Sequence, residues 1–274
     1  MSISNITSTF SVQSNLSALS NTGKLLQQTE QQLATGKSVN SAADNAAAFN
    51  AAQGFLQQAG DLTNLKDNLS TSLTTVNSAT NSLSSVGQVV QQLQGIVSQA
   101  ANTTDPTARA NLATQYNALL PQLDQLANDS GFNGTNLLNS TSNSLTVYFN
   151  SSNTAGLTIS GVNVTSSGLN ISTASNGFAS TSDINAANAQ LQSALSTLGS
   201  DASTFGNNAT LIQTNQDFSS NLINNLQTAA NNLTVADTNE AGANLLALQA
   251  QNQLGVVSLS ISGQAAQNIL RLFD

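Results

Sequence analysis

Acidic side chains are the residues of this chain best suited to chemistry, because two carboxylates held close together can transfer protons or bind a metal ion. The thirteen Asp and Glu residues are dispersed along the sequence. Asp124 and Asp129 are near each other in number, but residues five apart on a helix do not share a face. Asp237 and Glu240 resemble a helix-capping pair more than a metal site. The carboxylates therefore predict no catalytic pair and no metal centre.

Two other reactive residue types, Cys and His, are missing. The chain has no Cys, which excludes disulfides and thiolate ligands, and no His, which is the commonest general base and metal ligand. We find no phosphate-binding glycine loop. Asp44 and Asp183 are candidates for helix caps. The sequence thus predicts no catalytic residue, no cofactor and no small-molecule substrate.

The charge pattern excludes two classes of partner. The formal net charge is −8, and the basic residues are only Lys24, Lys37, Lys66, Arg109 and Arg271. They are scattered, whereas nucleic-acid binding needs clustered Lys and Arg to neutralise phosphates. An anionic membrane surface would repel this chain for the same reason. We therefore expect neither nucleic acid nor membrane as a partner.

The N-terminus gives little information on location. Residues 1–6 contain neither a basic segment nor an apolar core, so no ordinary secretory signal is expected. No apolar run approaches the ~18–20 residues of a membrane span. Two possibilities remain open at this point. The chain stays in the cytoplasm, or it leaves by a route without a cleaved signal.

Apolar residues recur at helical spacing near both ends of the chain, which predicts long coiled-coil helices. The N-terminal series contains Gly23 and Glu30 as weak positions, and the C-terminal part has two series, 191–233 and 246–272. Another regular series extends from Leu83 to Ala100. The apolar members nearest the two ends of the chain are Val12, Leu16, Leu19, Leu26, Leu33, Leu246, Leu254, Val257, Ile261 and Leu272.

The middle of the chain changes to a period of two, which predicts short strands separated by turns. Candidate strands lie at 145–149, 157–159, 162–164 and 169–171. Before them, Asp105 and Pro106 predict a helix break and restart, and Pro121 predicts a kink or split. The expected fold is mainly α. Long antiparallel coiled-coil helices are formed by the N- and C-terminal regions, with a small hairpin-like β insert in the middle.

The terminal series contain few large apolar side chains, and Asn, Ser and Thr are mediocre helix formers. We therefore expect residues 1–40 and 240–274 to be disordered in the free chain and to fold on association.

Three motifs resemble one family, the bacterial flagellins. Residues 32–47 resemble the flagellin segment that ends the first helix, and residues 130–138 resemble its F-N-G-x-x-L-L turn. Residues 269–273 resemble the aliphatic and basic flagellin C-terminus, although an extra Asp274 follows. Together the resemblance covers nearly the whole chain. The motif positions we single out are Gly36, Asn40, Asp44, Phe132, Asn133 and Gly134.

The resemblance implies a short flagellin without large central surface domains, which polymerises into the flagellar filament. Residues 1–40 and 240–274 would be the terminal helices of the inner filament core. Residues 41–135 and 185–239 would be an outer helical domain, to which the β insert 136–184 belongs. The resemblance implies that the apolar series at both ends of the chain form the contacts between subunits in the filament, which we call polymerisation seams. The implied partners are other copies of the chain, the type III export apparatus, an export chaperone, and the filament cap and junction proteins. The implied location is the extracellular flagellum.

One departure from the family pattern is informative. Many flagellins carry an Arg and a Glu that the vertebrate innate flagellin receptor contacts. By alignment those positions are Gln92 and Gly95. An amide cannot replace the forked, charge-assisted bonding of a guanidinium. We therefore expect weak or absent activation of that receptor.

Three other functions are alternatives to this one. A hook–filament junction protein shares the terminal helices and the export route, but the turn motif and the C-terminus favour flagellin. A secreted adhesin or type III translocator predicts an apolar membrane segment, which the sequence lacks. An enzyme is the most remote alternative, since metalloprotease inserts require His.

Overall fold

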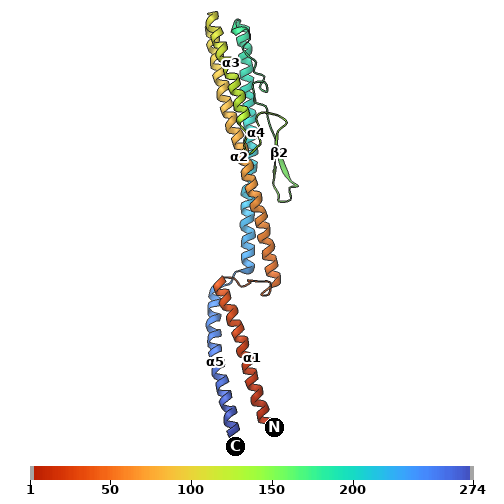
Figure 1. Cartoon of the computed structure of the whole chain (residues 1–274), viewed down its shortest axis with the longest axis vertical. Coiled ribbons are helices and arrows are strands. Elements are labelled where there is room, and N and C mark those ends of the chain that lie inside the picture. Colours follow the sequence, from red (N-terminus) through yellow and green to blue (C-terminus); the bar gives the residue numbers. More distant parts are fainter. Residues whose placement is uncertain (1–2, 272–274) are drawn as a thin grey trace. The chain divides into compact units, whose positions relative to one another are not determined.

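The computed structural model describes residues 3–271, and it confirms a mainly α fold with a small β insert. Two compact units are present: Ala59–Asn224 forms one, and the residues before and after it form the other. The elements, shown in Figure 1, are α1 (Ile3–Thr35), α2 (Ala46–Asn102), α3 (Pro106–Asp129), β1 (Ser144–Tyr148), β2 (Gly156–Ser160), the short 3₁₀ helix η1 (Ser175–Phe178), α4 (Thr181–Thr234) and α5 (Thr238–Arg271).

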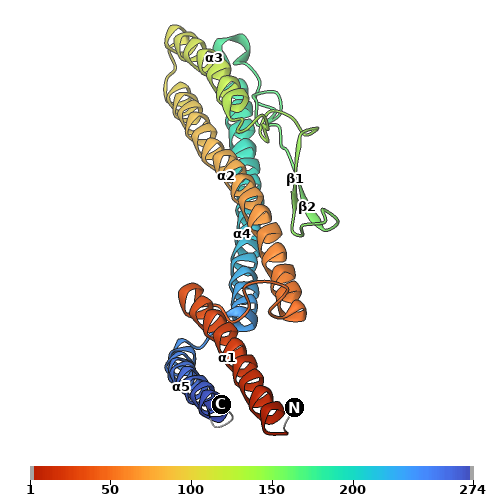
Figure 2. The same cartoon turned by 60° about the horizontal axis from the view of Figure 1, so that its bottom comes forward.

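Helices α1 and α5 form an antiparallel pair, with both chain ends at the same end of the pair (Figures 1 and 2). The amide Nδ2 of Asn15 lies 3.3 Å from Ser258 Oγ and 3.3 Å from Ser262 Oγ. At the opposite end of the pair, the Ala236 N–H donates to the Gly36 carbonyl at 3.0 Å. The start of α1 therefore lies beside the end of α5. This confirms the expected antiparallel terminal helices.

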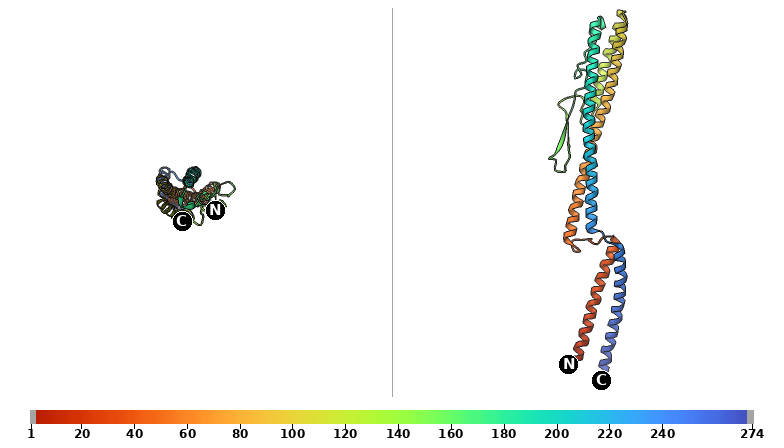
Figure 3. Two further views of the ribbon diagram at one scale, coloured as in Figure 1. Left: turned by 90° about the horizontal axis from the view of Figure 1, so that it is seen from above. Right: turned by 180° about the vertical axis from the view of Figure 1, so that it is seen from behind.

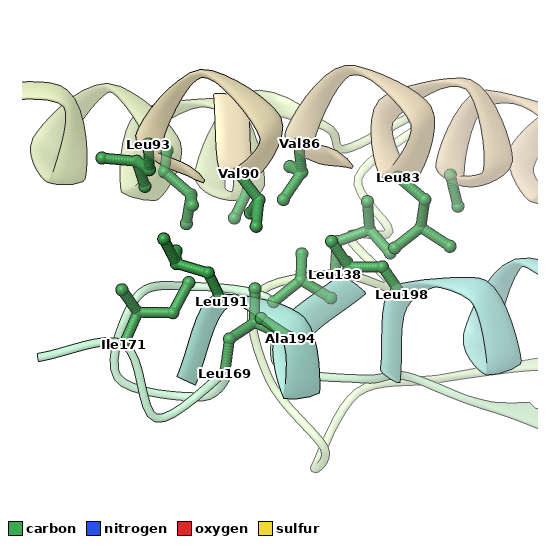
Figure 4. Packing of buried hydrophobic residues seen from close by; sticks show 14 of the residues in the cluster. Leu83, Val86, Val90, Leu93, Leu138, Leu169, Ile171, Leu191, Ala194 and Leu198 are labelled. Atoms are coloured by element: carbon green, nitrogen blue, oxygen red, sulfur yellow. The ribbon is translucent and has the colours of Figure 1, made fainter. Parts of the chain in front are cut away.

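The unit Ala59–Asn224 has an extensive apolar core, in which α2 and α4 pack along their length (Figures 3 and 4). Side chains of Leu83, Val86 and Val90 face those of Leu191 and Leu198. All of these are at most 4% exposed. They recur with the alternating steps of three and four that coiled-coil packing requires. The predicted series from Leu83 to Ala100 is confirmed, and further buried members that the sequence reasoning did not include are Leu69, Val76 and Ala79.

Helix α3 begins where the sequence predicts. Asp105 is its N-cap and accepts a hydrogen bond from the Thr107 N–H at 2.9 Å, with Pro106 in the first turn. The helix then continues through Pro121, so of the two outcomes predicted there, a kink or a split, the split is wrong. An internal Pro costs roughly 3 kcal/mol of helix stability. Buried side chains on both sides of it, Leu120 and Leu123, pack into the core and offset this loss.

The β insert contains one antiparallel hairpin, β1–β2, in which Thr146 pairs with Thr158. Within residues 3–271 the candidate strands 162–164 and 169–171 are not strands. The Val162 and Val164 N–H groups instead donate to the carbonyls of residues 137 and 138, in a single bridge. Residues 169–171 lie in a tight turn with Asn170 at φ 55°. Their apolar side chains are nevertheless buried, which explains the alternation seen in the sequence.

Tyr116 on α3 provides a test of this core. Its ring is fully buried against Phe178, with centroids 5.5 Å apart and edge to face, and its hydroxyl has no hydrogen-bond partner. Burial raises the pKa of Tyr116 to about 12. Its protonated form is therefore favoured by folding, and this contribution to stability is complete below the ordinary pKa of about 10 and lost as the pH rises towards 12.

We predict that Tyr116→Phe raises the free energy of unfolding by about 1 kcal/mol, because a buried hydroxyl without a partner is removed. The advantage over the unsubstituted chain should grow above pH ~10, where the unfolded tyrosine ionises. Urea unfolding at neutral and alkaline pH measures both effects. Tyr148→Phe is the matched control, since Tyr148 is 41% exposed and should change little. Equal stability of the Tyr116→Phe and unsubstituted chains at all pH values would contradict this account.

Candidate functional site

The α1–α5 pair leaves most of its apolar surface uncovered. Among the side chains described on these two helices, only Thr29 and Ala241 are buried. A large apolar side chain buried from water contributes about 1.5–3 kcal/mol, so this pair gains little from its own packing. The exposed large apolar side chains on it are Phe10, Leu16, Leu25, Leu33, Leu246, Leu254, Val256, Val257 and Ile261.

The surface between α1 and α5 mixes large apolar residues with small and polar ones. Leu19 lies directly against Gly255, where an added Cβ would meet Leu19 Cδ1 at 3.0 Å. Asn15 bridges two serines of α5. Apart from Gly242 and Gly263, the buried and half-buried positions on α5 are Ala241, Leu245, Leu248, Asn252, Gly255, Leu259 and Ser262, which we call the inner series. Apart from Gly23 and Gln32, those described on α1 are Val12, Asn15, Leu19, Thr22, Leu26 and Thr29.

The structure divides the residues predicted as polymerisation seams between two faces. Val12, Leu19 and Leu26 are half-buried on the side of α1 that faces α5. All the other described members are exposed, namely Leu16, Leu33, Leu246, Leu254, Val257 and Ile261, with the four on α5 between 54% and 69%. Leu272 lies outside the described residues. The sequence reasoning missed the inner series of α5, because its regular spacing is carried by Ala, Asn, Gly and Ser as well as Leu.

Residues 36–39 form hydrogen bonds with the segment that joins α4 to α5. Gly36 has φ 67°, a left-handed conformation that glycine adopts without steric cost at the end of a helix. The Ser38 N–H donates to the Thr234 carbonyl at 2.7 Å, and Lys37 pairs with Val235 in a β-bridge. The Thr234 carbonyl, the last of α4, lacks a partner within its own helix and is thereby satisfied by a segment distant in sequence.

Asp44 closes the turn that follows. Its carboxylate accepts hydrogen bonds from the Ser41 N–H at 2.9 Å, the Asn40 N–H at 3.0 Å and the Ser41 hydroxyl at 3.1 Å. The backbone bond from Ser41, followed by that from Asn40, lowers the pKa of Asp44. Asn45 caps α2, since its side chain accepts from the Ala48 N–H at 3.0 Å. The expectation that Asp44 is a helix cap is therefore wrong.

The other two predicted caps are present. Ser180 and Asp183 exchange hydrogen bonds at the start of α4, as in a capping box. Asp237 accepts from the N–H groups of Asn239 and Glu240 and so caps α5. These carboxylates stabilise helix starts.

The second motif forms a tight turn. Phe132 and Thr135 exchange two backbone hydrogen bonds of 2.9 Å. The two residues between them, Asn133 and Gly134, both have positive φ, 49° and 79°. Such turns favour Asn followed by Gly. The turn is followed directly by Leu137 and Leu138, which are buried in the core.

Gln92 and Gly95 lie on the outward face of α2. Both are exposed, whereas Leu93 and Val97 between and beside them are buried. A partner that binds this face would contact the side-chain amide of Gln92 and the backbone of Gly95, which has no side chain.

The carboxylates do not form a reactive group. Asp124 accepts from the Ser166 N–H at 2.6 Å and from its hydroxyl at 3.1 Å, and thereby anchors the loop of the β insert to α3. Within residues 3–271 no three His, Cys, Asp or Glu side chains gather in a way that would hold a metal ion. No described helix is long and apolar enough to cross a membrane.

Comparison with known proteins identifies the family. A family model described as the bacterial flagellin N-terminal helical region matches residues 6–143. The chain belongs to the bacterial flagellins. Flagellin FljM of Caulobacter vibrioides is 28% identical over 265 residues, covering 94% of both chains. Flagellin FljN of the same organism is 28% identical over 259 residues, again covering 94% of each. The crystal structure of Bacillus cereus flagellin aligns with a TM-score of 0.48 and 17% identity, over 56% of this chain and 88% of that one.

As a flagellin, the chain is a structural subunit that polymerises into the flagellar filament and serves motility. The resemblance inferred from the three sequence motifs is confirmed. The flagellins are a family of structural proteins. The carboxylates described above, which cap helices or fix turns, are consistent with a structural role.

Proposed function

We propose that α1 and α5 carry the contacts that join flagellin subunits, and that residues 1–40 and 240–274 form the inner core of the filament. Residues 41–135 and 185–239 form an outer helical domain, and the β insert 136–184 belongs to it. One observation carries this proposal: about half of the large apolar side chains described on the α1–α5 pair are exposed, whereas most of those on α2 and α4 are buried or half-buried, with Leu56, Leu211, Phe218 and Leu233 as exceptions. Open helical growth requires such surfaces, which only another copy can cover.

The charge of α5 supports the same proposal. Between Ala241 and Leu270 the sequence contains no charged residue; Glu240 and Arg271 lie at the two ends. Uncharged apolar surfaces can approach one another without electrostatic repulsion or the cost of removing charges from water. Burying four side chains such as Leu246, Leu254, Val257 and Ile261 at about 1.5–3 kcal/mol each would supply several kcal/mol per subunit.

We predict that the full chain polymerises after salting-out or seeding and that a chain lacking residues 240–274 does not. The physical reason is that the truncation removes α5 and leaves α1 without its partner. Negative-stain electron microscopy of both preparations measures the outcome. A full chain that stays monomeric, or that only caps existing filaments, would favour a junction protein instead. Polymerisation of the truncated chain would show that other surfaces drive assembly.

We further propose that residues 1–40 and 240–274 are disordered in the free subunit and fold when subunits join. The small buried surface of the α1–α5 pair supports this, because ordering a residue costs about 1–2 kcal/mol of backbone conformational entropy. Limited proteolysis of the monomer should remove both ends and spare residues 41–239. Survival of both ends in the monomer would count against this proposal.

The route and location are also proposals. The chain would leave the cell through the flagellar type III apparatus with an export chaperone, assemble beneath the filament cap onto junction proteins, and reside in the extracellular flagellum. Family membership and the absence of Cys support this, since a chain without disulfides suits export in an unfolded form. Quantifying the chain in sheared flagella tests it, because a filament subunit is abundant and a junction protein is scarce.

We also propose that the flagellin catalyses no reaction and takes no cofactor. The sequence contains neither His nor Cys, and the carboxylates whose contacts are described above cap helices, close a turn or anchor a loop. Assays of peptidase activity on purified filaments would reveal an exception.

We predict weak or absent activation of the vertebrate flagellin receptor, because Gln92 and Gly95 replace an Arg and a Glu on an exposed face of α2. Neither residue offers the charge-assisted bonds of the pair it replaces. A receptor reporter assay with monomeric chain measures the response. The double variant Gln92→Arg, Gly95→Glu should respond more strongly than the unsubstituted chain. A full response by the unsubstituted chain at ordinary flagellin doses would contradict the prediction.

A further inference from the structure

A polar groove of ≈ 420 Å³ lies between α2 and the tip of the β1–β2 hairpin, which runs beside that helix (Figure 2). Its walls are formed by Asp61, Asn64 and Asn68 of α2 and by residues 151–153 of the tip, and Leu65 contributes the apolar surface. Ligand sites in proteins commonly measure roughly 300–1,000 Å³. The groove is therefore large enough to hold a small ligand.

The polar side chains of this groove are not used by the fold. Those of Asp61, Asn64, Asn68 and residues 151–153 are exposed, and within residues 3–271 none of them has a hydrogen-bond partner in the protein. Elsewhere in the insert the asparagines bond to the backbone, as listed for three of them: Asn136, Asn143 and Asn150. The hydrogen-bonding groups of the groove thus remain available to a ligand.

Both walls are held in place before any ligand binds. At the tip, the Asn150 side chain accepts from the Thr154 N–H at 3.0 Å, and the Asn153 N–H donates to the Asn150 carbonyl at 3.2 Å. Val147 of the hairpin is buried in the core, and the opposite wall is a regular helix. A site whose walls are already ordered loses little conformational entropy on binding.

The residue types of the groove indicate the class of ligand. An Asn side chain offers two N–H donors and an acceptor, and a Ser hydroxyl both donates and accepts. A divalent cation would use acceptors alone, six to eight of them for Ca²⁺, and Asp61 is the single carboxylate here. The hydroxyl groups of a sugar donate and accept in the same way as the groove does. An uncharged, polyhydroxylated ligand therefore matches it best.

Tyr148 provides an aromatic surface next to these amides. It lines an adjoining part of the groove, of ≈ 280 Å³, which shares Leu65, Asn68 and Asn153 with the first. Its ring lies close to Gly156 on the paired strand, where an added Cβ would be 3.1 Å from Tyr148 Cδ1. The face of an aromatic ring is negative and attracts the weakly positive C–H groups on the flat side of a pyranose.

We propose that this groove binds a neutral oligosaccharide. Asn64, Asn68 and Asn153 exchange hydrogen bonds with its hydroxyl groups, Asp61 accepts one, and Tyr148 contacts the C–H face of a sugar ring. The inference is independent of the proposed role of α1 and α5, because every residue of the groove belongs to the unit Ala59–Asn224.

Saturation-transfer difference NMR with the full chain tests the proposal. The probes are three neutral trisaccharides, namely maltotriose, cellotriose and triacetylchitotriose, at concentrations up to about 10 mM, which would nearly saturate a site with a Kd of order 1 mM. Asn64→Ala and Asn68→Ala remove groove amides at exposed helix positions, where Ala is a good helix former. Asn81→Ala makes the same change at an exposed position of α2 outside the groove and is the matched control.

Tyrosine fluorescence gives a second measurement. The chain has two Tyr and no Trp, so Tyr148 is the only emitter of this kind in a Tyr116→Phe background. A trisaccharide that contacts the Tyr148 ring should change this emission, with the same concentration dependence as the NMR signal. Tyr148→Phe should keep the affinity seen by NMR, because it keeps the ring, whereas Tyr148→Ala should lower it several-fold.

At least one trisaccharide should bind the unsubstituted chain, and Asn64→Ala and Asn68→Ala should each weaken its binding about five- to tenfold, as expected for the loss of one or two hydrogen bonds. The Asn81→Ala chain should bind as the unsubstituted chain does. No signal from any of the three probes would overturn the proposal, as would equal binding by the groove variants and the control. Calorimetric binding of CaCl₂ without binding of a sugar would identify a cation site instead.

Discussion

Two helices packed side by side can each bury only one face, and this constraint governs the whole chain. In the unit Ala59–Asn224, α3 and the β insert add cover over the α2–α4 core, so Leu, Val and Phe side chains become buried. Helices α1 and α5 have each other alone. Their shared face mixes Leu with Ala, Asn, Gly, Ser and Thr, and the rest of their large apolar residues, such as Leu246, Leu254 and Ile261, remain exposed. The first unit buries most of its large apolar side chains within one chain, whereas the second leaves many of its own exposed.

The sequence predicts those elements in which one face holds large aliphatic residues. The series from Leu83 to Ala100 is buried as expected, and the predicted series 191–233 is buried or half-buried as far as Ala230, whereas its last member, Leu233, is exposed. The turns at Gly36 and Asn133–Gly134 follow from residues that tolerate positive φ. Prediction from the sequence was poorer where the helical spacing was regular but many residues at those positions were not apolar. The inner series of α5 is carried partly by Asn252 and Gly255, which a hydrophobic pattern does not reveal. The segments 162–164 and 169–171, predicted as strands, show alternation for a different reason: their apolar side chains pack against the core from an isolated bridge and from a turn.

Side-chain amides replace secondary structure in the insert. Asn136 donates to the carbonyls of Ala127 and Asn128, and Asn143 donates to the carbonyl of Asn136. Asn150 accepts from the N–H groups at the hairpin tip. Backbone groups in irregular segments need such partners when strands do not supply them. The high Asn content of this chain thus has a structural use that composition alone did not predict, because the same residues also occur at the exposed positions of helices.

The bond between Ser38 and Thr234 joins residues 196 positions apart. Closing so long a loop in an unfolded chain is entropically unfavourable and slow to find. The unit Ala59–Asn224 is nested between these two residues, and the antiparallel packing of α2 on α4 brings the two ends of that unit to the same side of it (Figure 1). Once the nested unit has formed, the remaining conformational search that brings Ser38 to Thr234 is short. The topology therefore favours a sequential order of folding, in which the middle of the chain forms first and the two ends meet last.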